Sequence, residues 1–132
     1  MFRKRLIRAV SSLSLLAFVV ASTVNAEHWV YLGNAHFDQQ KDHKTIHVGT
    51  ADGSFHKIQL RVNGGAVFFE RVVVHFADGT QEELAMNDRV RSGGKTRKLD
   101  LPGGNRVLDS VELWYSKEKP GQNPEVSLYG AR

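Results

Sequence analysis

The chain has 132 residues, a length that supports one domain with a single modest core. Its formal net charge is +4, from 18 Lys and Arg against 14 Asp and Glu. Four basic residues lie near the start and no acidic residue precedes Glu27, so residues 27–132 carry equal numbers of basic and acidic groups. This balance argues against a nucleic acid partner held by bulk charge, because that mode of binding needs a surplus of Lys and Arg.

Residues 1–26 have the pattern of a secretory signal peptide. The positive start is Arg3, Lys4, Arg5 and Arg8, the apolar stretch is Leu13–Ala21, and Val24-Asn25-Ala26 offers the small residues that a signal peptidase reads. The apolar stretch is shorter than the roughly 20 residues that a spanning helix needs, which disfavours the alternative of an uncleaved membrane anchor. We expect cleavage after Ala26, a mature chain in the periplasm or outside the cell, and no membrane span in that chain.

The absence of cysteine limits the chemistry of an exported domain. Small exported domains often use disulfides, and this chain has none, so residues 27–132 must gain their stability from burial alone. A thiol nucleophile, a thiolate metal site and an acylated-cysteine anchor are excluded. The serines lie in no nucleophile-elbow context either, so nucleophilic catalysis finds no support.

Alternation with a period of two dominates from residue 45 onward and predicts strands. Ile58, Leu60 and Val62 share one face of their segment, as do Val111, Leu113 and Tyr115. No part of residues 27–132 has a sustained helical period. We predict a single all-β domain over 27–132, an antiparallel β-sandwich of jelly-roll-like form, with a small barrel as the other architecture. About eight short strands are expected, at 29–32, 45–49, 55–62, 66–76, 80–86, 96–101, 107–116 and 125–130.

Turn residues separate these strands where hairpins would place them. Asp52-Gly53, Asn63-Gly64-Gly65 and Asp78-Gly79 supply the positive φ angles that tight hairpins demand. The run from Val67 to Val74 is apolar on both faces, as in a central strand covered on both sides.

Five segments in this order resemble a known family. They are Phe55–Val62, Gly65–Phe76, Gly93–Gly103, Arg106–Tyr115 and Leu128–Arg132. Together they resemble a family of small exported bacterial proteins described only as a domain of unknown function, over about residues 30–132. The resemblance implies a compact β-sandwich in the periplasm or outside the cell, and it brings no catalytic residues to transfer.

Aromatic and arginine residues are the first candidates for a binding site. Trp114 and Tyr129 lie out of phase with the apolar positions of their strands, where a flat ring can stack on a ligand or a partner. Arg97 and Arg106 flank glycine-rich loops, where a guanidinium can hold an anion. The competing interpretations are ordinary cross-strand aromatic pairs and surface ion pairs.

A histidine cluster supports a second function class. His36, Asp38, His43 and His47 are competent ligands for zinc, copper or nickel. His43 and His47 share a face of a strand but lie about 13 Å apart there. The segment Asp38–Lys44 otherwise reads as a polar loop.

The sequence therefore favours a non-catalytic binding or interaction domain of the bacterial cell envelope, using Trp114, Tyr129, Arg97 and Arg106. We expect a monomer, no cofactor, and an envelope protein or a glycan as partner. The alternative is a metal-binding protein or metal-dependent hydrolase built on the histidine cluster. A third possibility is a structural role, in which an exposed edge strand pairs into a larger assembly.

Overall fold

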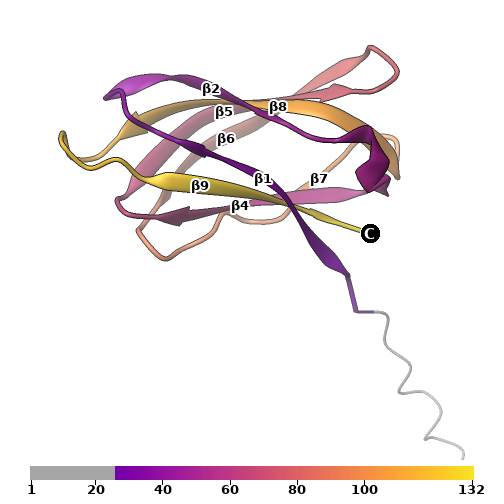
Figure 1. The fold of residues 1–132 in the computed structure, drawn as a ribbon, viewed down its shortest axis with the longest axis horizontal. Helices are drawn as coiled ribbons and strands as arrows, with labels where there is room; N and C mark the ends of the chain where they lie inside the picture. Colours follow the sequence, from indigo (N-terminus) through magenta and orange to yellow (C-terminus); the bar gives the residue numbers. More distant parts are fainter. Residues whose placement is uncertain (1–25) are drawn as a thin grey trace, which may run out of the picture.

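Two antiparallel β-sheets lie face to face in two layers (Figure 1). The computed structural model describes residues 26–132, so the predicted signal peptide up to residue 25 lies outside the described residues. One sheet has four strands in the order β1-β9-β4-β7. The other has five, in the order β2-β8-β5-β6 with β3 beside β8. The predicted all-β sandwich is confirmed.

The described residues form nine strands and one 3-10 turn, and most strand bounds lie close to the predicted ones. The elements are β1 (Trp29–His36), β2 (Lys41–His47), η3 (Thr50–Asp52), β3 (Ser54–Phe55), β4 (Lys57–Asn63), β5 (Val67–Phe76), β6 (Gln81–Val90), β7 (Leu99–Asp100), β8 (Arg106–Lys117) and β9 (Glu125–Ala131). The predicted strand 55–62 is divided at His56, because β3 pairs with β8 whereas β4 pairs with β9 in the other sheet.

The prediction of a polar loop over Asp38–Lys44 is wrong in its second half. Lys41 begins β2, which pairs with β8 as far as His47. β2 is an edge strand, so its polar side chains reach solvent while its backbone bonds to one neighbour only. Alternation of apolar residues cannot reveal such a strand, because so little of it is buried.

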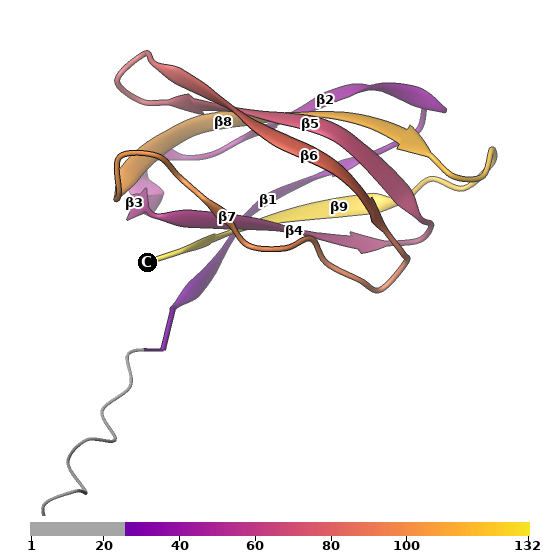
Figure 2. The ribbon, with the colours of Figure 1, turned by 180° about the vertical axis from the view of Figure 1, so that it is seen from behind.

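The predicted turns are present, but only one of them joins neighbours in a sheet. Asp78-Gly79 connects β5 to β6, with the Phe76 amide donating to the Thr80 carbonyl at 2.9 Å. Asn63-Gly64-Gly65 instead carries the chain from β4 in one sheet to β5 in the other. Figure 2 shows a similar crossing between β6 and β7. A turn sequence determines a change of direction and not the neighbour that follows.

The interior is filled by the inner rows of both sheets. β8 contributes Leu108, Val111, Leu113 and Tyr115, all completely buried. Each such side chain contributes about 1.5–3 kcal/mol by leaving water. Other large buried side chains are Phe37, Phe55, Phe69, Ile46, Ile58, Leu60 and Leu128.

β5 lies between β8 and β6, as its apolar composition suggests, but no further layer of the described residues covers its outer side. Val73 faces outward and is only 5% exposed, since the side chains of neighbouring strands surround it. Phe68 on the same strand is 37% exposed. The sequence predicted a layer on each side of this strand. On its outer side, the side chains of the neighbouring strands provide part of the cover instead.

A buried lysine joins two loops at one end of the sandwich. Lys117 is 5% exposed and its ammonium group lies 3.3 Å from both the Asp38 carbonyl and the Asn123 side-chain oxygen. The Gln40 side chain donates to the Lys117 carbonyl at 2.6 Å. Because buried ammonium groups need such acceptors, Lys117 holds the β1–β2 loop against the β8–β9 loop.

Gly130 marks a point of close packing between strands and the interior. A Cβ atom there would lie 2.8 Å from the Phe55 ring and 2.9 Å from Leu32. We predict that Gly130→Ala lowers the free energy of unfolding by about 1–3 kcal/mol, because the ring must move out of a filled interior. Urea unfolding measures this change. Ser127→Ala, on the outward side of the same strand, should change it by less than about 0.5 kcal/mol; equal effects would contradict the close packing.

Candidate functional site

The four predicted binding residues lie on separate surfaces. Trp114 projects from the outer face of the five-stranded sheet, in the row formed with His43 and Arg71. Tyr129 projects from the outer face of the other sheet. The structure therefore does not bring the two aromatic rings together, and one small ligand cannot touch both.

Trp114 already has a neighbour from each adjacent strand. The His43 ring stacks on the indole at a centroid distance of 5.1 Å and an angle of 13°. From β5, the Arg71 guanidinium carbon lies 4.0 Å from the centre of the same ring system. Because β2 and β5 flank β8 on opposite sides, these partners occupy the ring surfaces that a stacked ligand would need.

Arg97 forms hydrogen bonds with the edge strand β6. Its guanidinium donates to the Ala85 carbonyl at 2.7 Å and pairs with Asp88. Asn87, between these two partners, has a φ of 61°, and the register with β5 shifts at this point. Arg97 therefore satisfies the backbone of a bulged edge that would otherwise be open to another strand.

Arg106 joins two loops. It donates to Thr80 at 2.7 Å and to the Pro102 carbonyl at 2.9 Å, and lies 3.4 Å from Asp78. Its guanidinium carbon lies 3.7 Å from the centre of the Phe76 ring. Paired surface charge, the competing interpretation, accounts for the contacts of both arginines.

The alternative metal ligands are also dispersed. His36 ends β1 and lies 3.6 Å from Glu125, and Asp38 lies 3.3 Å from Lys44. His43 stacks on Trp114, and His47 lies four residues further along the same strand, β2, which belongs to the five-stranded sheet and not to the sheet of His36. Within residues 26–132 no three His, Asp or Glu side chains are grouped closely enough to hold a metal ion.

The outer face of the four-stranded sheet gathers the most continuous set of aromatic and polar side chains. We call the surface formed by Tyr31, Asn34, Arg61 and Tyr129 the tyrosine face; Gln59 belongs to the same side of the sheet but is only 5% exposed. Strand pairing builds it from two adjacent rows. Tyr31, Tyr129 and Gln59 form one row across β1, β9 and β4, and Asn34, Ser127 and Arg61 form the next.

The side chains of the tyrosine face hold one another in place. Asn34 donates to the Tyr31 hydroxyl at 2.8 Å, and the Tyr31 ring meets Tyr129 edge to face at 5.6 Å. The Arg61 guanidinium carbon lies 3.8 Å from the centre of the Tyr129 ring. Gln59 donates to the Thr96 carbonyl at 2.8 Å. Tyr31 is nevertheless 50% exposed, so a rigid aromatic surface is available to solvent.

A cluster of charges around Glu27 lies at one end of this sheet. The Glu27 carboxylate lies 2.6 Å from Lys57, 3.2 Å from Lys98 and 3.3 Å from His56. The hydrogen bond from Lys57, followed by those from Lys98 and His56, lowers the pKa of Glu27 to about 2. The start of the described chain is thereby attached to β4, and backbone hydrogen bonds between His28 and Arg132 attach it to the other terminus.

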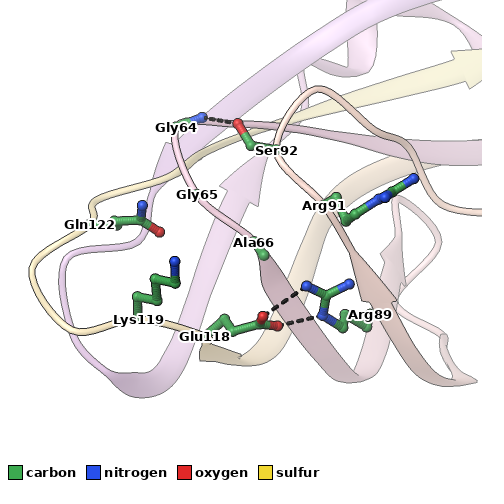
Figure 3. Close-up of a pocket in the computed structure, with 9 residues that line it drawn as sticks. All are labelled: Gly64, Gly65, Ala66, Arg89, Arg91, Ser92, Glu118, Lys119 and Gln122. Atoms are coloured by element: carbon green, nitrogen blue, oxygen red, sulfur yellow. Dashed lines mark hydrogen bonds and ion pairs between the residues drawn. The ribbon is translucent and has the colours of Figure 1, made fainter.

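A cavity of about 340 Å³ lies between three loops at one end of the sandwich (Figure 3). The acidic group in its lining is Glu118, which pairs with Arg89 through both oxygens. The Arg91 guanidinium points away from the other side chains drawn (Figure 3). Ser92 accepts a hydrogen bond from the Gly64 amide at 3.0 Å. Arg91 and Lys119 have no ion pair within the described residues, so the lining keeps a positive charge, but it contains no aromatic side chain. The tyrosine face is therefore the better candidate for a site that stacks on a ligand.

Only Tyr129 of the tyrosine face was among the residues predicted to bind. Alternation in 57–63 already places Gln59 and Arg61 on the polar side of their strand, and Tyr31 follows the same rule near the start. Which strands lie beside β9 could not be derived, because alternation determines faces and not neighbours. The missing information was therefore the order of the strands.

A family profile described as Domain of unknown function (DUF2541) matches residues 9–130. The chain belongs to this family. The resemblance seen in the five sequence segments is thereby confirmed. None of the curated proteins matches the chain. A solved structure of AlgX from Pseudomonas aeruginosa is similar at 14% sequence identity and a TM-score of 0.52, covering 76% of this chain and 26% of that one. This member of the DUF2541 family thus spans about a quarter of AlgX, and the likeness concerns the fold alone.

Within residues 26–132, no helix is long and apolar enough to cross a membrane.

Arg97 gives the first test of these assignments. We predict that Arg97→Ala lowers the free energy of unfolding by about 1 kcal/mol and increases self-association at high concentration, because the β6 edge loses its cover. Urea unfolding and light scattering measure the two effects. Arg91→Ala is the control, since Arg91 has no acidic partner within the described residues. Association that is the same in both variants would refute the role of Arg97 at the edge.

The contacts of Glu27 predict that the stability of the domain depends on pH. The pKa of Glu27 is lower in the folded chain than the ordinary value of 4.5. Its contribution to the free energy of unfolding is therefore complete above about pH 4.5 and is lost as the pH falls toward 2. We expect the free energy of unfolding to decline over this range, and to decline less steeply in Glu27→Gln. Urea unfolding at several pH values tests this, and identical slopes would contradict the assignment.

Proposed function

We propose that this protein is a non-catalytic binding domain of the bacterial cell envelope and that its tyrosine face takes a saccharide chain. The observation that carries the proposal is the half-exposed Tyr31 ring, held by Asn34 and by the edge of Tyr129. The pattern of residues 1–26 supports export to the periplasm or beyond the cell.

The chemistry of the tyrosine face suits a saccharide better than an apolar partner. An aromatic ring can pack against the apolar side of a sugar ring, while amide and guanidinium groups bond to its hydroxyls. Tyr31 supplies the ring, and Asn34, Ser127 and Arg61 supply polar groups in the adjacent row. A protein–protein hot spot would instead favour a desolvated apolar centre, and the exposed aromatic ring here is surrounded by polar neighbours.

Of the residues favoured by the sequence, Tyr129 is kept in this proposal. Trp114, Arg97 and Arg106 have partners within the domain that occupy the groups a ligand would need. A metal-dependent function is not proposed, since His36, Asp38, His43 and His47 hold separate positions.

The proposal is tested by ligand-induced stabilisation. The full chain, expressed from Met1, is purified in the form in which the cell leaves it, and its mass reports whether the bond after Ala26 is cut. It is then melted with cello-, malto- and chito-oligosaccharides and with peptidoglycan fragments. At about 100 times its Kd, a ligand adds about 2.7 kcal/mol, or several degrees. We predict such a shift with at least one saccharide.

Two variants locate the binding. Tyr31→Ala removes an exposed ring without opening the interior, so it should melt cooperatively and lose the shift. Trp114→Ala, on the opposite face, should retain the shift. Absence of a shift with every saccharide, or loss of the shift in Trp114→Ala alone, would disprove the proposed site.

A further inference from the structure

Among the residues that the structure describes, Arg61 lacks an acidic partner, unlike the comparable arginine on the opposite face. Arg61 stacks on Tyr129 and Arg71 stacks on Trp114, at 3.8 Å and 4.0 Å respectively. Arg71 has a counter-ion, since Glu83 lies 3.4 Å away. Within residues 26–132, Arg61 has no ion pair, and its Nε atom is buried without a hydrogen-bond partner. The positive charge is held in position and left uncompensated.

A second cation lies opposite Arg61. Residues 93–96 run along the free edge of β4, and Lys95 forms an isolated antiparallel bridge with Arg61. Such pairing places both side chains on the same face of the sheet, with Cβ atoms about 4.5–5.5 Å apart. Lys95 is exposed and has no ion pair within the described residues. Like charges directly opposite destabilise a sheet, and a bound anion removes that cost.

The acidic groups of this sheet are engaged elsewhere. Glu125 lies one row further along and is 3.6 Å from His36. Glu27 is bonded to Lys57 and Lys98, and Asp100 lies opposite Lys57 in the strand register, away from Arg61 and Lys95. None of these carboxylates lies within 4 Å of Arg61 or Lys95 among the described residues, so both cations are free to take an anion from outside the domain.

We propose that the saccharide bound by the tyrosine face carries an oxyanion, a carboxylate or a phosphate, and that Arg61 and Lys95 bind it. This proposal rests on the proposed function and specifies its ligand. The guanidinium of Arg61 presents paired donors to the oxygens, as arginine does for both groups, and Lys95 adds a point charge from the other side. The row Asn34–Ser127–Arg61–Lys95 then runs alongside the aromatic row, so a chain that crosses the strands contacts both.

The test compares ligands that differ only in charge. Trigalacturonate is compared with its methyl ester, and mannose 6-phosphate with mannose, which separates a carboxylate source from a phosphate source. Affinities are measured by calorimetry on the purified full chain, at low and moderate salt. Phosphate and acetate alone are titrated by NMR. We expect at least one acidic ligand to bind about tenfold or more tightly than its neutral counterpart, and the backbone amide signals of Arg61 and Lys95 to shift.

Matched variants show which residues cause the preference for acidic ligands. Arg61→Gln should remove the preference for the acidic ligand, and Arg71→Gln, which alters the other stacked arginine, should retain it. Without ligand, Lys95→Gln should melt at the same temperature as the original chain or higher, because it removes a repulsion. A preference unchanged in Arg61→Gln would overturn the proposal, and so would the absence of any response to charged ligands.

Failure here is distinguishable from failure of the proposed function. If neutral saccharides bind, and Tyr31→Ala abolishes this while Arg61→Gln does not change the ratio between acidic and neutral forms, the tyrosine face stands and the anion site is refuted. If no saccharide binds but phosphate or acetate shifts the amide signals of Arg61 and Lys95, the anion site stands and the saccharide is refuted.

Discussion

The alternation of β8 between a buried row and an exposed row is the constraint on which the rest of the structure depends. Its backbone pairs with β2, β3 and β5, so three other strands take their positions from it. Its inner side chains, from Leu108 to Tyr115, fill the centre of the interior. A slip of one residue would place Glu112 and Trp114 inside and the apolar row in water, which is why the register is strongly determined.

The same alternation produces two outer faces that differ in charge balance. On the face of β8, Trp114 is covered by a ring from one neighbour and a guanidinium from the other, and Glu112 accepts from His75 at 2.6 Å. These groups satisfy one another. On the other face, Arg61 and Lys95 have no such compensation within the described residues. The distinction between the faces is therefore one of charge balance more than of aromatic content.

Much of the fold follows from local sequence. Most strands and turns were predictable, because burial on one side imposes a period of two and tight turns require glycine or asparagine. β2 was missed over Lys41–Lys44, since an edge strand buries too little to show a pattern. The division at His56 was missed because the chain continues in extended form while it changes partner.

The candidate site was predictable only in part. The sequence by itself determined which residues face outward, including Tyr129, Gln59 and Arg61, because the face of a strand is a local property. It also determined the family and the all-β class. Only the tertiary structure decided that Tyr31 lies beside Tyr129 and that Lys95 lies opposite Arg61, since these residues are far apart along the chain. Strand order depends on how whole sheets pack, and no local pattern encodes it.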